Sequence, residues 1–169
     1  GNHSEALGRD RREWTQTEWQ LGSGYGEQTA PRFHVVAYDF GVKKNILQCI
    51  VDRGAQVKVF PAKTSLAEVD AYQPHGYFIS NGPGDPAPMD YAISTVRTLL
   101  EKNKPLFGIC LGHQLLALAN GVSTFKMHHG HRGLNHPVKN LVTGRSEITT
   151  QNHGFGVDPA SIEKADHIE

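Results

Sequence analysis

The pattern of apolar and polar residues changes near residue 33. Residues 1–31 are polar and broken by glycine, and their large anchors are Trp14 and Trp19. From Phe33 onward, short apolar runs alternate with segments whose apolar residues recur at helical spacing. We therefore expect residues 1–31 to form a linker or an arm, and residues 32–169 to form the folded domain.

Four apolar runs predict strands, and the segments between them predict helices. The expected strands are 33–40, 56–60, 76–80 and 105–109, and the expected helices are 42–54, 89–103 and 111–120. Ser65 and Glu68 have the spacing of a capping box and predict a short helix over 65–72. Strands that alternate with helices predict an α/β fold: a mostly parallel, open sheet with helices on both faces.

The pattern beyond Gly121 indicates β-structure and loops. Short strand-like segments are expected at 122–126, 137–142 and 145–150, with a hairpin turn at Thr143–Gly144. Four histidines within 128–136 raise the question of a metal site, but they lie in a segment broken by glycine and without Cys, Asp or Glu. We expect a loop there and no metal, because structural zinc needs four converging ligands, usually including cysteine.

Composition excludes several classes of protein. Seventeen basic and seventeen acidic residues balance, which argues against a nucleic-acid or anionic-membrane binder. No apolar run approaches the ~18 residues of a membrane-spanning helix. Two cysteines provide no disulfide framework, so we expect a reducing, cytoplasmic location.

One of those cysteines, Cys110, has the surroundings of a nucleophile. It follows an apolar strand and precedes a helix, with Gly108 and Gly112 on either side. This is the form of a nucleophile elbow, in which small residues let a strained turn pass without clashes. The start of the helix favours a thiolate, and the amide of Leu111 points to where an oxyanion would form.

A second oxyanion donor is expected from the segment "NGPGDP" at the end of the preceding strand. Pro83 has no N–H, so Gly82 or Gly84 would have to donate. The alternative for Cys110 is a buried small hydrophobe, which the flanking glycines disfavour. For Cys49, within an apolar helix, a core position is expected.

Five motifs in order resemble one enzyme family. The segment "GICLGHQ" at 108–114 resembles the nucleophile region of class I glutamine amidotransferases. The segments "YDFGVKKNIL", "SNGPGDP", "HRGLNHPV" and "TTQNHGFGVD" are most similar, within that family, to the small chains of carbamoyl phosphate synthetases. The resemblance runs from about Phe33 to about Asp158.

The resemblance implies a role for each matching residue. Cys110 would attack the side-chain amide of L-glutamine, release ammonia and form a glutamyl thioester. The glutamine site would be lined by Gly82, Gly84, Leu111, Gln114, Asn152, Gly154 and Phe155. The ammonia would pass to a large, ATP-using synthetase subunit. No cofactor and no metal are implied for this chain.

Thiol chemistry of this kind also needs a base and a residue that orients it. In the family this pair is a His-Pro-Glu segment after the "QNHGF" loop, and the sequence contains none. His136–Pro137 precedes that loop and continues with Val138, and His167 has the spacing His-x-Glu but comes too early. We therefore expect a truncated glutaminase domain, with residues 1–31 as an arm from a missing N-terminal domain.

Two alternatives stay open at this stage. One is a catalytically incomplete module that binds glutamine or docks on a synthetase. The other is a cysteine hydrolase of similar fold with another substrate, which the combination of the glycine-rich loop and "QNHGF" disfavours.

Overall fold

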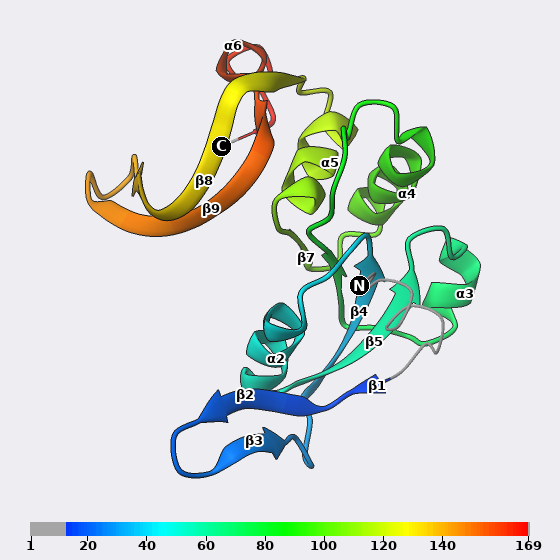
Figure 1. The fold of residues 1–169 in the computed structure, drawn as a ribbon. Helices are drawn as coiled ribbons and strands as arrows, with labels where there is room; N and C mark the ends of the chain where they lie inside the picture. Colours follow the sequence, from blue (N-terminus) through cyan, green and yellow to red (C-terminus); the bar gives the residue numbers. More distant parts are fainter. Residues whose placement is uncertain (1–12, 169) are drawn as a thin grey trace.

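A central sheet organises the computed structural model, which describes residues 13–168 (Figure 1). Its five strands lie in the order β1-β5-β4-β6-β7. Their bounds are β1 Glu13–Trp14, β4 Phe33–Asp39, β5 Ala55–Pro61, β6 Gly76–Ile79 and β7 Leu106–Gly108. β4, β5, β6 and β7 pair in parallel, and β1 alone is antiparallel, at the β5 edge.

Side chains that alternate along the strands divide the core between the two faces of the sheet. On β4, Val36 and Tyr38 belong to one buried cluster and Ala37 belongs to the other. The first cluster is completed by α3 (Leu66–Asp70), α4 (Asp90–Glu101) and α5 (Leu111–Ala119), and the second by α2 (Lys44–Asp52). The predicted α/β architecture, mostly parallel with helices on both faces, is confirmed.

Helices α2, α3, α4 and α5 begin and end within two residues of the bounds that the sequence predicts. Ser65 Oγ accepts a hydrogen bond from the Glu68 amide at 3.4 Å, as expected of an N-cap. Gly54 and Gly121 follow α2 and α5 in left-handed conformations, with φ of +93° and +80°, which glycine adopts without steric cost. Within residues 13–168, no helix combines the length and apolar character needed to cross a membrane.

The expected arm is structured over residues 13–27. β1 pairs with β5, and β2 (Gln16–Gln20) and β3 (Gly24–Glu27) form a hairpin beside α2. Cys49 lies at this contact, half-buried, with its Sγ 2.7 Å from Glu18 Oε1. The expectation of a core position for Cys49 is therefore wrong, because its face of α2 meets a polar hairpin rather than the sheet. The rest of the expected arm, 1–12, lies outside the described residues.

The C-terminal segment is a long two-stranded ribbon rather than loops and short strands. β8 (Thr124–Lys139) pairs antiparallel with β9 (Ser146–Val157), and α6 (Pro159–Ile162) follows. The ribbon curves away from the body of the molecule (Figure 1). The histidine-rich segment and the "QNHGF" segment, both expected as loops, lie inside these strands. Register shifts at 126–131 and 133–136 accommodate Gly130 and Gly133, whose φ values are positive.

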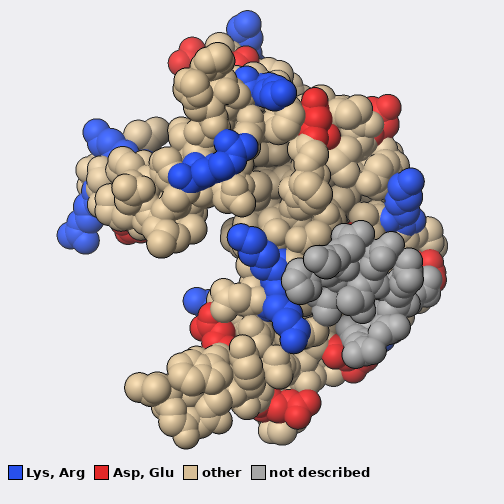
Figure 2. Space-filling view, in the orientation of Figure 1, with Lys and Arg blue, Asp and Glu red and all other residues tan. Residues whose placement is uncertain are grey.

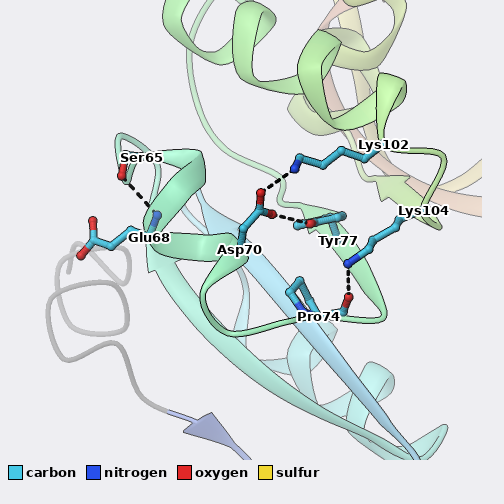
Figure 3. A network of polar contacts seen from close by, with 7 residues as sticks. All are labelled: Ser65, Glu68, Asp70, Pro74, Tyr77, Lys102 and Lys104. Carbon is cyan, nitrogen blue, oxygen red and sulfur yellow. Dashed lines mark hydrogen bonds and ion pairs between the residues drawn. The ribbon is translucent and has the colours of Figure 1, made fainter.

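A polar network joins α3 to the chain that leads into β7 (Figure 3). Asp70 accepts hydrogen bonds from Tyr77 Oη at 2.8 Å and from Lys102 Nζ at 2.5 Å. Lys104 Nζ donates to the carbonyl of Pro74 at 2.8 Å. Burial raises the pKa of Asp70, but the hydrogen bonds and the lysine charges outweigh it, so the net pKa is lowered. The network ties α3 to the amino-terminal ends of β6 and β7, opposite the carboxyl end of β7 that Cys110 follows.

Candidate functional site

Cys110 lies between the end of β7 and the start of α5. Its backbone has φ of 53° and ψ of −109°, a region that residues with a Cβ rarely occupy. Strain of this kind persists only where the surrounding structure imposes it, and it is typical of active sites. The predicted nucleophile elbow is present, and the half-buried thiol lies at the carboxyl edge of the sheet, where parallel sheets bind ligands.

Close packing explains why glycines flank the elbow. A Cβ on Gly108 would lie 2.5 Å from the carbonyl carbon of Gly112. A Cβ on Gly112 would lie 2.1 Å from the carbonyl oxygen of Ile79, the last residue of β6. The Ile109 amide also donates to that oxygen at 3.2 Å. The elbow therefore presses directly on the end of β6, from which the glycine-rich loop begins.

The glycine-rich loop needs its glycines for two different reasons. A Cβ on Gly82 would lie 2.4 Å from the Phe40 carbonyl oxygen, so only glycine fits against the chain that leaves β4. Gly84 has open space but a φ of +102°, which favours glycine. Both residues follow β6, and Cys110 follows the neighbouring strand β7, so all three lie at the same edge of the sheet. This is the placement that the sequence predicts for an oxyanion loop.

β9 completes the surroundings of the thiol from the other side. The Sγ of Cys110 lies 3.8 Å from the carbonyl oxygen of Asn152. Gln114, only 5% exposed on α5, donates from Nε2 to the Phe155 carbonyl at 2.8 Å. The structure thus brings Asn152, Phe155 and, between them, Gly154 to the first turns of α5. In the space-filling view the molecule is hollowed between the ribbon and the β2–β3 hairpin (Figure 2).

Two histidines brace this part of the ribbon. His153 Nδ1 lies 2.8 Å from the carbonyl oxygen of Phe155. His153 Nε2 lies 3.0 Å from His131 Nδ1 and 2.9 Å from Gln151 Oε1. The sequence patterns did not indicate that His131 lies beside His153 in the candidate site. Its signal was the position opposite His153 in an antiparallel pair, which sequence spacing alone does not reveal.

Three further histidines lie on different elements: His113 on α5, His136 on β8 and His167 after α6. His113 is exposed on α5, and the ring of His136 packs 5.1 Å from that of His131 on the ribbon. His167 lines a polar cavity of about 430 Å³ together with Asn120 and Gly121, at the opposite end of α5 from Cys110. Glu169, its expected partner, lies outside the described residues. Over 13–168, no imidazole is in hydrogen-bond contact with the Cys110 thiol, and no three His, Cys, Asp or Glu side chains converge as metal ligands.

The chain matches known proteins at the level of sequence. Residues 36–168 match the family model of class-I glutamine amidotransferases. Over 150 residues the chain is 61% identical to a carbamoyl phosphate synthase small chain from Ralstonia nicotianae, covering 89% of this chain and 40% of that protein. A second such chain, from Pasteurella multocida, is 60% identical over 149 residues, with coverage of 88% and 39%. The chain thus spans about 40% of the length of these curated relatives.

Solved structures share the fold at lower identity. A glutamine amidotransferase from Methylobacillus flagellatus superposes with a TM-score of 0.59 at 18% identity, covering 76% of this chain and 57% of that one. Another glutamine amidotransferase, from Thermotoga maritima, gives a TM-score of 0.53 at 16% identity, covering 75% and 62%. At these identities the likeness establishes the architecture alone.

Proposed function

The chain belongs to the class-I glutamine amidotransferase family, and from that premise we propose that it is the glutamine-hydrolysing domain of a carbamoyl phosphate synthase small chain. One observation carries the proposal: the glycine-rich loop and β9 both lie beside a single cysteine with a strained backbone. The similarity to small chains at 61% and 60% identity supports this member of the family over others.

The proposed reaction is nucleophilic acyl transfer at Cys110. The thiolate attacks the side-chain carbonyl carbon of L-glutamine, the C–N bond breaks after nitrogen is protonated, and ammonia leaves a glutamyl thioester. Water then hydrolyses the thioester to glutamate and regenerates the thiol. The proton transfers require a base in addition to the residues that contact Cys110 here.

The oxyanion and the substrate are assigned to separate elements. The amide of Leu111, the first residue of α5, and an amide of Gly82 or Gly84 would stabilise the oxyanion. Gln114 and the β9 residues Asn152, Gly154 and Phe155 would hold the α-amino and carboxylate groups. A zwitterion needs both donors and acceptors, and the carbonyl of Asn152 near the thiol is one acceptor.

The similarity to small chains supports a proposal for the partner and the setting. The ammonia would be consumed by a large synthetase subunit that uses ATP and bicarbonate, in the biosynthesis of arginine or pyrimidines. Residues 1–31 are proposed to link this domain to one that precedes it. A cytoplasmic location suits the free thiols of Cys49 and Cys110.

The test is covalent trapping by an electrophilic analogue of glutamine. We expect intact mass spectrometry to show one adduct, located at Cys110 by peptide mapping and absent from Cys110→Ala. A folded protein that reacts with iodoacetamide at Cys110 but not with the analogue would contradict the proposal, because the thiol would then be accessible without a glutamine site around it.

A further inference from the structure

We propose that Asn81 is a positioning residue for this reaction: its side chain locks the glycine-rich loop to the turn after β4 and thereby sets where the oxyanion donors point. The inference rests on the proposed function, and it assigns to Asn81 a role that none of the sequence motifs indicated.

The Asn81 side chain bridges two strand ends. Its Nδ2 donates to the carbonyl of Gly41 at 3.0 Å, and its Oδ1 accepts from the Lys43 amide at 3.4 Å. Gly41 and Lys43 belong to the segment that leaves β4, whereas Asn81 follows β6. One amide group therefore pairs with both a backbone acceptor and a backbone donor of the neighbouring turn.

Ser80 and Asp39 make both sides of this contact rigid. Ser80, fully buried, accepts a hydrogen bond from the Phe40 amide at 2.9 Å and donates to the Asn81 carbonyl at 2.8 Å. Asp39, 3% exposed, accepts from the amides of Gly41 and Val42 at 2.8 and 2.9 Å. The turn that receives Asn81 is thus itself held in shape by a buried carboxylate.

The two segments are also in direct backbone contact. A Cβ on Gly41 would lie 3.2 Å from Pro83 Cδ and 3.4 Å from Gly82 Cα. On the other segment, a Cβ on Gly82 would lie 2.8 Å from Phe40 Cβ. The loop of Gly82 and Gly84 therefore packs directly against the turn after β4. The side chain of Asn81 joins the two segments by hydrogen bonds.

Positioning of this kind affects reaction rate more than binding. An oxyanion donor stabilises charge that develops only as the thiol attacks, and a displacement of about 1 Å can cost ~100-fold in rate. The groups proposed to hold the glutamine backbone lie instead on α5 and β9, which Asn81 does not contact through the hydrogen bonds above. Loss of the Asn81 bridge should therefore reduce the rate of attack while leaving glutamine affinity nearly unchanged.

The experiment compares Asn81→Ala and the isosteric Asn81→Asp with Asn120→Ala. Asn120 also donates from Nδ2 to a backbone carbonyl, that of Leu116 at 2.9 Å, but at the far end of α5. Each protein is treated with a chloroketone analogue of L-glutamine, whose carbonyl enters the oxyanion site, and separately with iodoacetamide, which needs no such site. The readouts are the maximal rate of Cys110 modification, the concentration of analogue that gives half that rate, and the melting temperature.

We expect both Asn81 variants to lower the maximal rate with the chloroketone by about tenfold or more, with less than about a threefold change in the half-saturating concentration. The rate with iodoacetamide should not change, and Asn120→Ala should behave as the wild type. Wild-type rates in folded Asn81 variants would overturn the inference. Equal losses with both reagents would also overturn it, since they would indicate a general loss of structure. Failure of the wild-type chain to react saturably with the chloroketone would instead contradict the proposed function itself.

Discussion

The two halves of the candidate site are built differently. The half with Cys110 belongs to the buried sheet edge, where Gly112 is packed so closely against Ile79 that no Cβ fits. The half with Asn152 and Phe155 belongs to a two-stranded ribbon whose side chains are mostly exposed or half-buried. The elbow of Cys110 is held by close packing, whereas the segment of β9 beside it is held by a few hydrogen bonds.

Under the proposed function, this difference matches the separate requirements of chemistry and of substrate binding. Attack needs sub-ångström placement, which close-packed backbone provides. A binding segment has only to be held beside the thiol. Gln114 Nε2 donates to the Phe155 carbonyl, and His153 Nδ1 lies 2.8 Å from the same oxygen. We therefore expect changes at the sheet edge to disrupt the fold and the chemistry together, and changes at the ribbon to affect the local structure of β9.

The largest effect is expected from Gly112→Ala. The new Cβ would meet backbone atoms at the end of β6, which cannot move aside as a flexible side chain would. We expect a loss of about 3 kcal/mol of unfolding free energy and little reaction of Cys110 with a glutamine analogue. Denaturant unfolding and intact mass measure both.

The control for that variant is Gly144→Ala in the turn of the ribbon. Gly144 also requires glycine, but only for its φ of +72°, since there is open space around it. A cost of about 1 kcal/mol with unchanged labelling is expected. If Gly112→Ala cost no more than Gly144→Ala and left labelling of Cys110 unchanged, close packing of the elbow against β6 would not be what holds the thiol in place.

Gln114→Ala tests the attachment of the ribbon. Removal of the buried amide should cost about 1–2 kcal/mol and should raise hydrogen exchange at β9 amides while those of β4 and β6 stay protected. The matched control is Gln48→Ala: Gln48 is 4% exposed on α2, and its Nε2 donates to Gln16 Oε1 at 2.9 Å. That variant should loosen β2 and not β9. Faster exchange throughout the sheet in Gln114→Ala would argue against a separately held ribbon.

Cys110→Gly should increase stability while it abolishes labelling. Glycine tolerates the φ of 53° that strains cysteine, so we expect a gain of about 1 kcal/mol in unfolding free energy. Cys110→Ala, which keeps a Cβ, should not show that gain. Equal stability of the two variants would mean that the elbow stores no strain.

The smallest effect is expected from Asp70→Asn, in the network far from the ribbon. A carboxyl whose pKa is lowered on folding stabilises the native state above its unfolded pKa of about 3.9, and this contribution is lost as the pH falls through the folded value. The variant should lose less than about 1 kcal/mol at pH 7, and the difference should shrink and then vanish as acidification protonates Asp70 in the folded protein. Thermal melts from pH 7 to pH 2 measure the difference. A gap that widened on acidification would contradict the sign.

The sheet-based half of the molecule could be predicted from the sequence because its strands are buried on both faces, which gives short apolar runs, and its helices on one face, which gives helical periodicity. Periodicity and capping residues such as Ser65 and Gly54 located the strands and helices to within a few residues. The elbow was evident because close packing there requires glycine at positions 108 and 112, and two glycines around a cysteine are readily recognised in a sequence.

The ribbon could not be predicted in the same way. A two-stranded sheet with little burial imposes no apolar alternation, so β8 with its five histidine and glycine positions from 128 to 133 resembled a loop. The contact of Gln114 with Phe155 joins residues 41 apart in sequence, and the bridge of Asn81 to Gly41 joins residues 40 apart. Such pairs follow from strand order, which spacing within one motif does not reveal.

The measurement that tests the account most directly compares the two enantiomers of an electrophilic glutamine analogue. If β9 and the elbow together form a glutamine site, the L-enantiomer should modify Cys110 at least about tenfold faster than the D-enantiomer, and free L-glutamine should slow the reaction. Equal rates for both enantiomers, without protection by L-glutamine, would show that β9 does not contribute to the reaction of the thiol. That result would contradict the existence of a glutamine site formed by β9 and the elbow.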